Sequence, residues 1–132
     1  MIAELAYAQY HNVQTRRQLE RIWHPAQCPC WHGSIRGEIP DGIGNLSGLV
    51  TLNLPENYLD GTIPAACGEL RQLQRLNLGS NRLHGSFPDE MEQMEELGVL
   101  DVSNNFIAGS IPSWLGKLSQ LRYLVKLNNL SI

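Results

Sequence analysis

The sequence predicts an α/β-type solenoid, a right-handed superhelix with a short parallel β-sheet on its concave face and a helical N-terminal cap. Two observations carry this prediction. Eight positions keep their chemical type through three successive cycles of 24 residues, without an insertion. Within each cycle, two apolar residues stand two positions apart, which is the spacing of one face of a strand. A fixed period of this length indicates coils that bury one another's apolar sides.

The repeating unit can be read directly from the sequence. In the first cycle the recurring residues are Leu49, Leu52, Leu54, Asn57, Leu59, Gly61, Ile63 and Pro64. The second and third cycles repeat this set in the same register. We therefore divide the chain into a helical cap, residues 1–26, and a solenoid, residues 27–132. The solenoid contains full repeats at 42–65, 66–89 and 90–113 and a partial repeat at each end.

One polar residue recurs at a position that the coil must bury. It is an asparagine in every cycle, at Asn57, Asn81, Asn105 and, in the partial last repeat, Asn129. A side-chain amide has two donors and an acceptor, so it can satisfy backbone groups at the turn that follows the strand. We expect a buried asparagine ladder in which each amide bonds its own turn and the next coil.

The consensus LxxLxLxxNxLxGxIPxxLGxL resembles the plant-specific class of leucine-rich repeats. That family includes ectodomains of receptor-like kinases and receptor-like proteins, and polygalacturonase inhibitors. The resemblance covers roughly Ile35 to Leu124, and its Gly-x-Ile-Pro segment separates this class from other repeat classes. It implies a second short strand near Leu59 to Ile63, recognition of peptides, proteins or glycans, and a cell-surface or extracellular location.

The two ends of the chain depart from the repeat. Thr15 and Gln18 predict a capping box for a helix that ends before Pro25. The segment from Cys28 to Gly33 is similar to the Cys-x-Trp-x-Gly stretch of the family, in which paired cysteines pin the cap. Near the C-terminus, Lys126 occupies an inward position and predicts an improvised or truncated cap.

Composition narrows the classes of function. The chain has 132 residues, enough for one domain, and a formal net charge of −3. This small acidic charge argues against a nucleic-acid partner. The first residues lack the basic start and apolar stretch of an export signal, and no segment approaches the roughly 18 apolar residues of a membrane span. Taken alone, the chain is expected to be cytoplasmic, in contrast to the location that the resemblance implies.

Candidate chemistry is sparse, and we expect no catalytic residue, no cofactor and no metal. The least favoured exception is zinc at His24, Cys28, Cys30 and His32, where the Cys-x-Cys gap is tighter than usual for zinc and structural cap residues are the preferred interpretation. Cys67 aligns with apolar core positions and is expected to be an inert thiol. An acidic run, Asp89 to Glu96, is interpreted as a solvated face. Two glycosylation signals begin at Asn45 and Asn129.

The outward residues of the strand face are the predicted binding surface. Stacking aligns them in three columns, and we predict that these bind a partner: Asn53, Asn77 and Asp101; Thr51, Arg75, Val99 and Tyr123; and Tyr58, Arg82 and Phe106. The third column is expected to place the Arg82 guanidinium between two aromatic rings, and Tyr and Arg are frequent interface anchors.

The sequence thus predicts a non-catalytic recognition module for a protein, peptide or glycan, receptor-like or inhibitor-like, of unspecified oligomeric state. Two alternatives stay open. One is a structural or surface-binding solenoid of the ice-binding type, against which the mixed columns argue. The other is a truncated paralogue without an independent function, because three repeats are near the minimum for a stable array.

Overall fold

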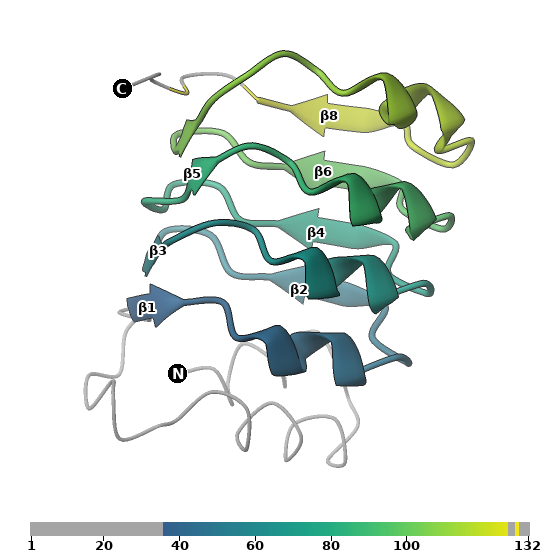
Figure 1. Ribbon diagram of the computed structural model, residues 1–132, viewed down its shortest axis with the longest axis horizontal. Coiled ribbons are helices and arrows are strands. Elements are labelled where there is room, and N and C mark those ends of the chain that lie inside the picture. The colour runs from purple at the N-terminus through teal and green to yellow at the C-terminus, as the bar shows by residue number, and fades with distance from the viewer. Residues whose placement is uncertain (1–35, 127–128, 130–132) are drawn as a thin grey trace.

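The structure is a computed structural model that describes residues 36–126 and residue 129. These residues form a stack of similar coils, each with a strand, a second short strand and a short helix (Figure 1). The helical cap expected at 1–26 and the His24, Cys28, Cys30 and His32 cluster lie outside the described residues.

One side of every coil is a strand of the principal sheet. The strands are β2 (Thr51–Asn53), β4 (Arg75–Asn77), β6 (Val99–Asp101) and β8 (Tyr123–Val125), parallel and in the order β2-β4-β6-β8. Leu52 lies opposite Leu76, and Leu76 lies opposite Leu100. The spatial register of this sheet therefore equals the period of the sequence, and the predicted parallel sheet is confirmed.

A second set of short strands forms the lateral side of the coils. It comprises β1 (Arg36–Glu38), β3 (Tyr58–Asp60), β5 (His84–Gly85) and β7 (Phe106–Ile107), with β1 parallel to β3 and β5 parallel to β7. These strands lie close to where the resemblance placed them. Their register differs from that of the principal sheet, because Arg36 lies opposite Tyr58 and His84 opposite Phe106. Residues that lie opposite each other on the lateral strands are thus separated in sequence by two positions fewer than the length of the repeat.

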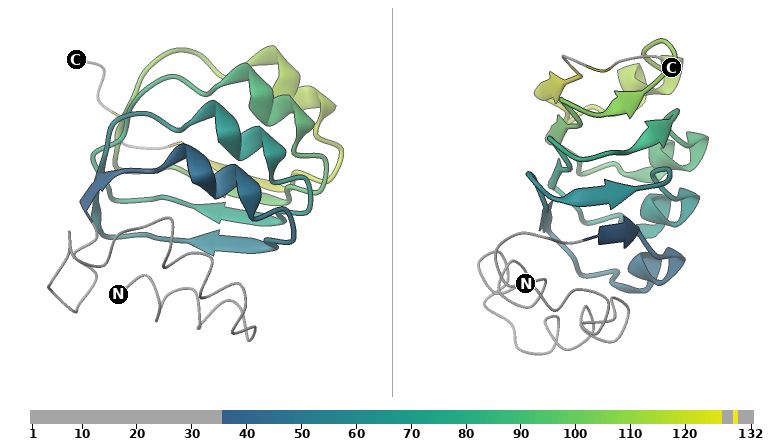
Figure 2. Two further views of the ribbon diagram at one scale, coloured as in Figure 1. Left: turned by 60° about the horizontal axis from the view of Figure 1, so that its bottom comes forward. Right: turned by 90° about the vertical axis from the view of Figure 1, so that its left-hand side faces the viewer.

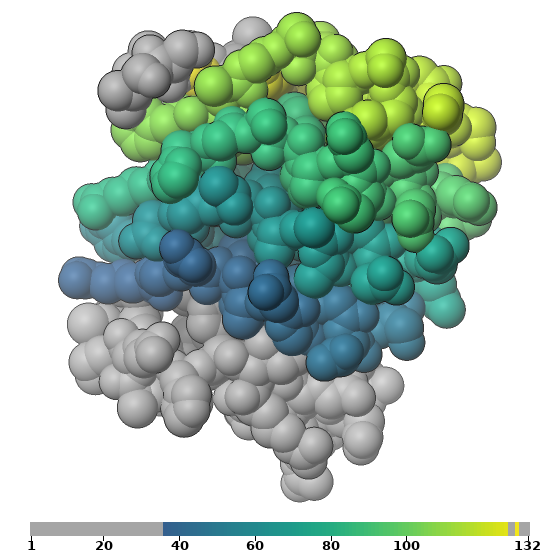
Figure 3. Space-filling view, viewed as in Figure 1, coloured from purple at the N-terminus to yellow at the C-terminus, as the bar shows by residue number. Residues whose placement is uncertain are grey.

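The third side of the coils carries short 3-10 helices (Figure 2). They are η2 (Asp41–Asn45), η3 (Ala65–Glu69), η4 (Asp89–Gln93) and η5 (Ser113–Lys117), each directly after a proline in extended conformation. Each of these helices has five residues, and helical segments this short often adopt the 3-10 form. Seen from this side, successive coils touch along the stack (Figure 3).

The core runs through the middle of the stack. Leucines of both strand types are buried with Cys67, Met91 and Met94. One expected core position differs: Ile39, Ile63 and Phe87 are buried, whereas the equivalent Ile111 is 60% exposed. No described coil stacks beyond Ile111, so its side chain keeps a face in solvent.

The asparagine ladder is present, with one correction to its direction. Asn81 Oδ1 accepts from the Leu59 N–H at 3.0 Å, and its Nδ2 donates to the carbonyls of Leu54 and Leu78 at 3.0 Å each. Asn105 and Asn129 repeat this arrangement. Each amide therefore joins its own turn to the preceding coil. The expected bond to the next coil is wrong, because the asparagine of the next coil makes that link: the Leu78 carbonyl accepts from both Asn81 and Asn105.

Candidate functional site

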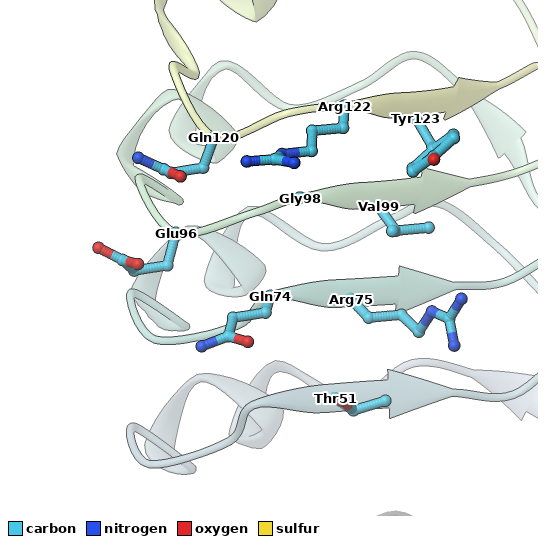
Figure 4. A pocket seen from close by; sticks show the side chains of 9 residues that line it. All are labelled: Thr51, Gln74, Arg75, Glu96, Gly98, Val99, Gln120, Arg122 and Tyr123. Atoms are coloured by element: carbon cyan, nitrogen blue, oxygen red, sulfur yellow. The ribbon is translucent and has the colours of Figure 1, made fainter.

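The outward face of the principal sheet contains a hollow of about 460 Å³ at the edge where the strands begin (Figure 4). It spans four coils. It is lined by Thr51, Gln74, Arg75, Glu96, Gly98, Val99, Gln120, Arg122 and Tyr123. In Figure 4 the Arg75, Val99 and Tyr123 side chains stand on the strands, and Gln74, Glu96 and Gln120 lie on the preceding turns.

A missing side chain explains the hollow. Position 98 belongs to a column directly before the strands, in which the neighbouring coils carry Gln74 and Arg122. The Gln74 carbonyl accepts both the Gly98 and the Val99 N–H groups, at 2.8 and 3.0 Å, so the backbone there is held by its neighbour. Glycine adds no side chain above this backbone, and a gap therefore opens between Gln74 and Arg122.

The hollow offers donors, acceptors and an aromatic ring close to one another. Arg75 and Arg122 supply guanidinium groups, and neither forms an ion pair within the described part of the chain. Tyr123 is 65% exposed and lies beside Val99. Tyr and Arg are enriched at the centres of protein interfaces and among the residues that contribute most to binding. This arrangement can hold a polar chain; it presents no paired acid and base.

The structure brings together one of the predicted columns. Thr51, Arg75, Val99 and Tyr123 all line the hollow. The sequence reasoning missed the residues on the turns, namely Gln74, Glu96, Gly98, Gln120 and Arg122. A signal for them existed, since a glycine that interrupts a column of larger residues predicts a gap on the surface.

A second predicted column is engaged with its own backbone. Asn77 Oδ1 accepts from the Gly79 N–H at 3.0 Å, and Asp101 Oδ1 accepts from the Ser103 N–H at 2.9 Å. Such contacts two residues ahead are Asx turns, which end a strand. Asn53, Asn77 and Asp101 are half-buried. Because Asn77 and Asp101 already bond their own backbone, they are less available to a partner than Arg75 and Tyr123, which line the hollow.

The third column lies on the lateral strands and differs from its expected packing. Arg82 stacks on the Tyr58 ring, with its guanidinium carbon 4.8 Å from the ring centroid, and Arg36 lies 5.4 Å from the same centroid. Tyr58 is thus the ring that contacts two cations. The expected sandwich of Arg82 between two rings is wrong, because the two-residue shift in register places Phe106 opposite His84.

Comparison with known proteins agrees with this architecture. The Leucine Rich Repeat family matches residues 48–70, 72–94 and 96–118, just over half of the chain. The chain therefore belongs to the leucine-rich-repeat family, and it resembles plant receptor ectodomains.

Two of the similar solved structures are receptor ectodomains. The plant peptide hormone receptor RGFR1 in complex with RGF2 is 36% identical, with a TM-score of 0.71 over 73% of this chain and 15% of that chain. The ectodomain of the plant membrane receptor kinase GASSHO1/SCHENGEN3 from Arabidopsis thaliana, in complex with CASPARIAN STRIP INTEGRITY FACTOR 2, is 38% identical, with a TM-score of 0.69 over 71% and 11%. The chain therefore spans only a small part of these receptors.

A third similar structure is a plant ice-binding protein, 25% identical, with a TM-score of 0.72 over 88% of this chain and 47% of that chain. A search of curated protein sequences found no match. In the described part of the chain, the helices are too short to cross a bilayer.

Proposed function

We propose that this chain is a non-catalytic recognition module that binds a peptide or protein on the outward face of its principal sheet. The hollow around Gly98 carries the proposal, because it combines an open floor with two uncommitted guanidinium groups and an exposed ring. The similarity to receptor ectodomains that were solved with peptide hormones supports the same class of partner. It also supports an extracellular or cell-surface location, whereas nothing in the comparisons supports the cytoplasmic expectation.

The geometry fits an extended polypeptide lying across the strands. The hollow crosses four coils, so an occupant contacts residues from β2 to β8. The guanidinium groups can donate to carbonyls or carboxylates of such a segment, and Tyr123 offers a surface for an apolar side chain. A glycan, which the family resemblance also implies, would use the same ring for stacking.

A change that fills the hollow tests the proposal. A Cβ at Gly98 would meet only the carbonyls of Gln74 and Gln120, each at 3.5 Å, which is ordinary contact. Gly98→Leu is therefore expected to fold and to occupy the space. Peptides selected for binding to the wild-type chain from a random display library should bind Gly98→Leu at least about tenfold more weakly, a loss of roughly 1.4 kcal/mol.

The lateral strands provide the matched comparison. The double variant Arg82→Ala and Phe106→Ala leaves the hollow intact and removes the predicted lateral contacts. If the selected peptides lose affinity for this variant and keep it for Gly98→Leu, then the binding surface is lateral and the proposal is wrong. Arg75→Ala with Tyr123→Ala gives a second test of the hollow that adds no bulk.

The ice-binding alternative follows from one observation, the 88% coverage by a plant ice-binding protein. Ice recognition on this face would need a regular surface, and the column Thr51, Arg75, Val99 and Tyr123 changes size and charge at each coil. A recrystallisation assay with the purified chain separates the two functions, since a recognition module should leave ice-crystal growth unchanged.

A further inference from the structure

Asn45 stands at the end of the helix η2, at a place where its side chain is open to solvent. Asn45 and Ser47 are exposed, whereas Leu46 between them is 3% exposed and anchored in the core. The turn is held by its own backbone, with Leu46 N–H donating to the Ile43 carbonyl at 3.1 Å and Leu49 N–H to the Leu46 carbonyl at 2.9 Å. The Asn45 side chain makes no hydrogen bond within the described residues.

Asn45, Leu46 and Ser47 form the Asn-x-Ser signal for N-glycosylation, with no proline in the middle. We propose that Asn45 is an N-glycosylation site of this protein when it passes through a secretory pathway, and that Asn129 is not. This inference rests on the extracellular location proposed above, but it needs no ligand for the sheet face. Asn45 does not line the hollow.

The chemistry is a transfer of a preassembled oligosaccharide from a lipid diphosphate carrier. Asn45 Nδ2 forms the bond to C1 of the first sugar and loses one proton, while the bond from C1 to the carrier's phosphate oxygen breaks and the lipid diphosphate leaves. The product amide keeps one N–H and the carbonyl oxygen. Neither the Nδ2 group nor the Oδ1 atom of Asn45 forms a hydrogen bond with another described residue. The modification therefore breaks no hydrogen bond of the described fold.

Asn129 has the same signal in sequence but another role in the structure. Its Nδ2 donates to the carbonyls of Val102 and Lys126, at 3.0 and 2.9 Å, and its Oδ1 accepts from the Ile107 N–H at 2.9 Å. A sugar on Nδ2 would replace one of these two donated hydrogens and would need space inside the ladder. Loss of such a bond leaves a partly buried carbonyl without its donor and destabilises the folded coil. The folded coil therefore competes with the modification.

The test uses the full chain behind a cleavable export signal, secreted from a eukaryotic host. Intact mass is measured before and after removal of N-glycans with a peptide N-glycosidase, which converts the modified Asn to Asp and so marks the residue in a peptide map. We expect one glycan at Asn45, its loss in both Asn45→Gln and Ser47→Ala, and an unchanged mass step in Asn129→Gln.

The repeat offers a matched gain of function. Glu69 occupies the position of Asn45 in the next coil, is also exposed, and is followed by Leu70 and Arg71. The double variant Glu69→Asn and Arg71→Ser transplants the signal into the same local geometry, and it removes only the exposed contact of Arg71 with Gln93. We expect a second glycan on this variant.

Two results would overturn the inference: a secreted chain with a cooperative thermal transition but without a glycan at Asn45, or a glycan found at Asn129. The proposed binding function can fail independently, because peptide selection on Gly98→Leu does not depend on glycosylation. Conversely, a glycan at Asn45 with no peptide binding would leave this inference standing and remove the binding proposal.

Discussion

The thiol of Cys67 lies in the core, at the position that Ile43, Met91 and Leu115 occupy in the other coils. Burial, and to a smaller extent the negative charge of Asp41, raises the pKa of this thiol from 9.0 to about 12. The thiolate is the reactive form, so an inert thiol is expected in the folded chain.

This shift makes a prediction about stability. In the unfolded chain the thiol ionises near pH 9, whereas in the folded chain it stays protonated until about pH 12. The contribution to stability is thus complete below pH 9 and is lost as the pH rises toward 12. In a chain with Cys28→Ser and Cys30→Ser, the free energy of unfolding in urea should fall by about 1 kcal/mol more between pH 8 and pH 10 than in the same chain with Cys67→Val. Equal pH dependence of the two chains would contradict it.

The residue before each ladder asparagine carries backbone strain. Glu56, Ser80 and Asn104 have φ values of 55°, 57° and 54°, which lie in the left-handed region. Asparagine tolerates this region better than other non-glycine residues, so only the third coil has the favourable side chain.

We therefore predict that Glu56→Asn raises the free energy of unfolding by about 0.5–1 kcal/mol and that Asn104→Glu lowers it by a similar amount. Glu56→Gln is the control, because it removes the charge but keeps a side chain that disfavours positive φ. The midpoint of urea unfolding reports all three changes. A gain in Glu56→Gln equal to that in Glu56→Asn would mean that charge, and not conformation, limits this turn.

Stacking of the 3-10 helices depends on glycine at one position of the coil. A Cβ at Gly44 would lie 2.8 Å from the Ala66 carbonyl oxygen, and a Cβ at Gly68 would overlap the carbonyl of Glu90. In the third coil this position is Glu92, and there the helices η4 and η5 are joined by side chains. Glu92 contacts Lys117 at 3.1 Å, and Asp89 accepts from the Trp114 Nε1–H at 3.2 Å. Part of the acidic run thus links two helices.

Gly68→Ala and Gly116→Ala form a matched pair at equivalent positions. We expect Gly68→Ala to lower the free energy of unfolding by about 1–3 kcal/mol, because the backbone of η4 must move. Gly116→Ala, for which nothing lies within 4 Å of the new Cβ, should be neutral or should stabilise by up to about 1 kcal/mol. Urea unfolding measures both. A similar loss in the two variants would show that the close approach of Gly68 to Glu90 is not the cause.

The sequence predicted the principal sheet because its register equals the repeat period, so that residues such as Leu52 and Leu76 become neighbours. The same logic failed on the lateral strands. There the register is shorter by two positions, and the contact of Arg36 with Tyr58 joins residues that the repeat does not align. The hollow was also missed, because the sequence reasoning followed columns of side chains, and its signal is the absence of a side chain at Gly98 between Gln74 and Arg122.

In the last described coil, a lysine side chain replaces a backbone donor. In the earlier coils, the carbonyls of Gly61 and Gly85 accept the backbone N–H of His84 and Ala108, each in the following coil, at 2.9 and 2.8 Å. The equivalent carbonyl of Gly109 accepts from Lys126 Nζ at 2.6 Å. Lys126 therefore supplies, from an inward position, the donor that another coil supplies elsewhere.

A charged side chain at the edge of a sheet also discourages pairing with another molecule. The strand β8 is the edge of the described principal sheet, and Ile111 beside this end is exposed. We predict that Lys126→Leu increases self-association relative to the wild-type chain, because it leaves the Gly109 carbonyl without its donor and adds apolar surface to the edge. Sedimentation velocity over a range of concentrations measures this effect.

Lys117→Leu is the control, since it adds the same side chain on the 3-10 helix side and loses only an exposed ion pair with Glu92. If both variants associate equally, then general hydrophobicity is responsible; if neither does, the ammonium group does not protect the edge.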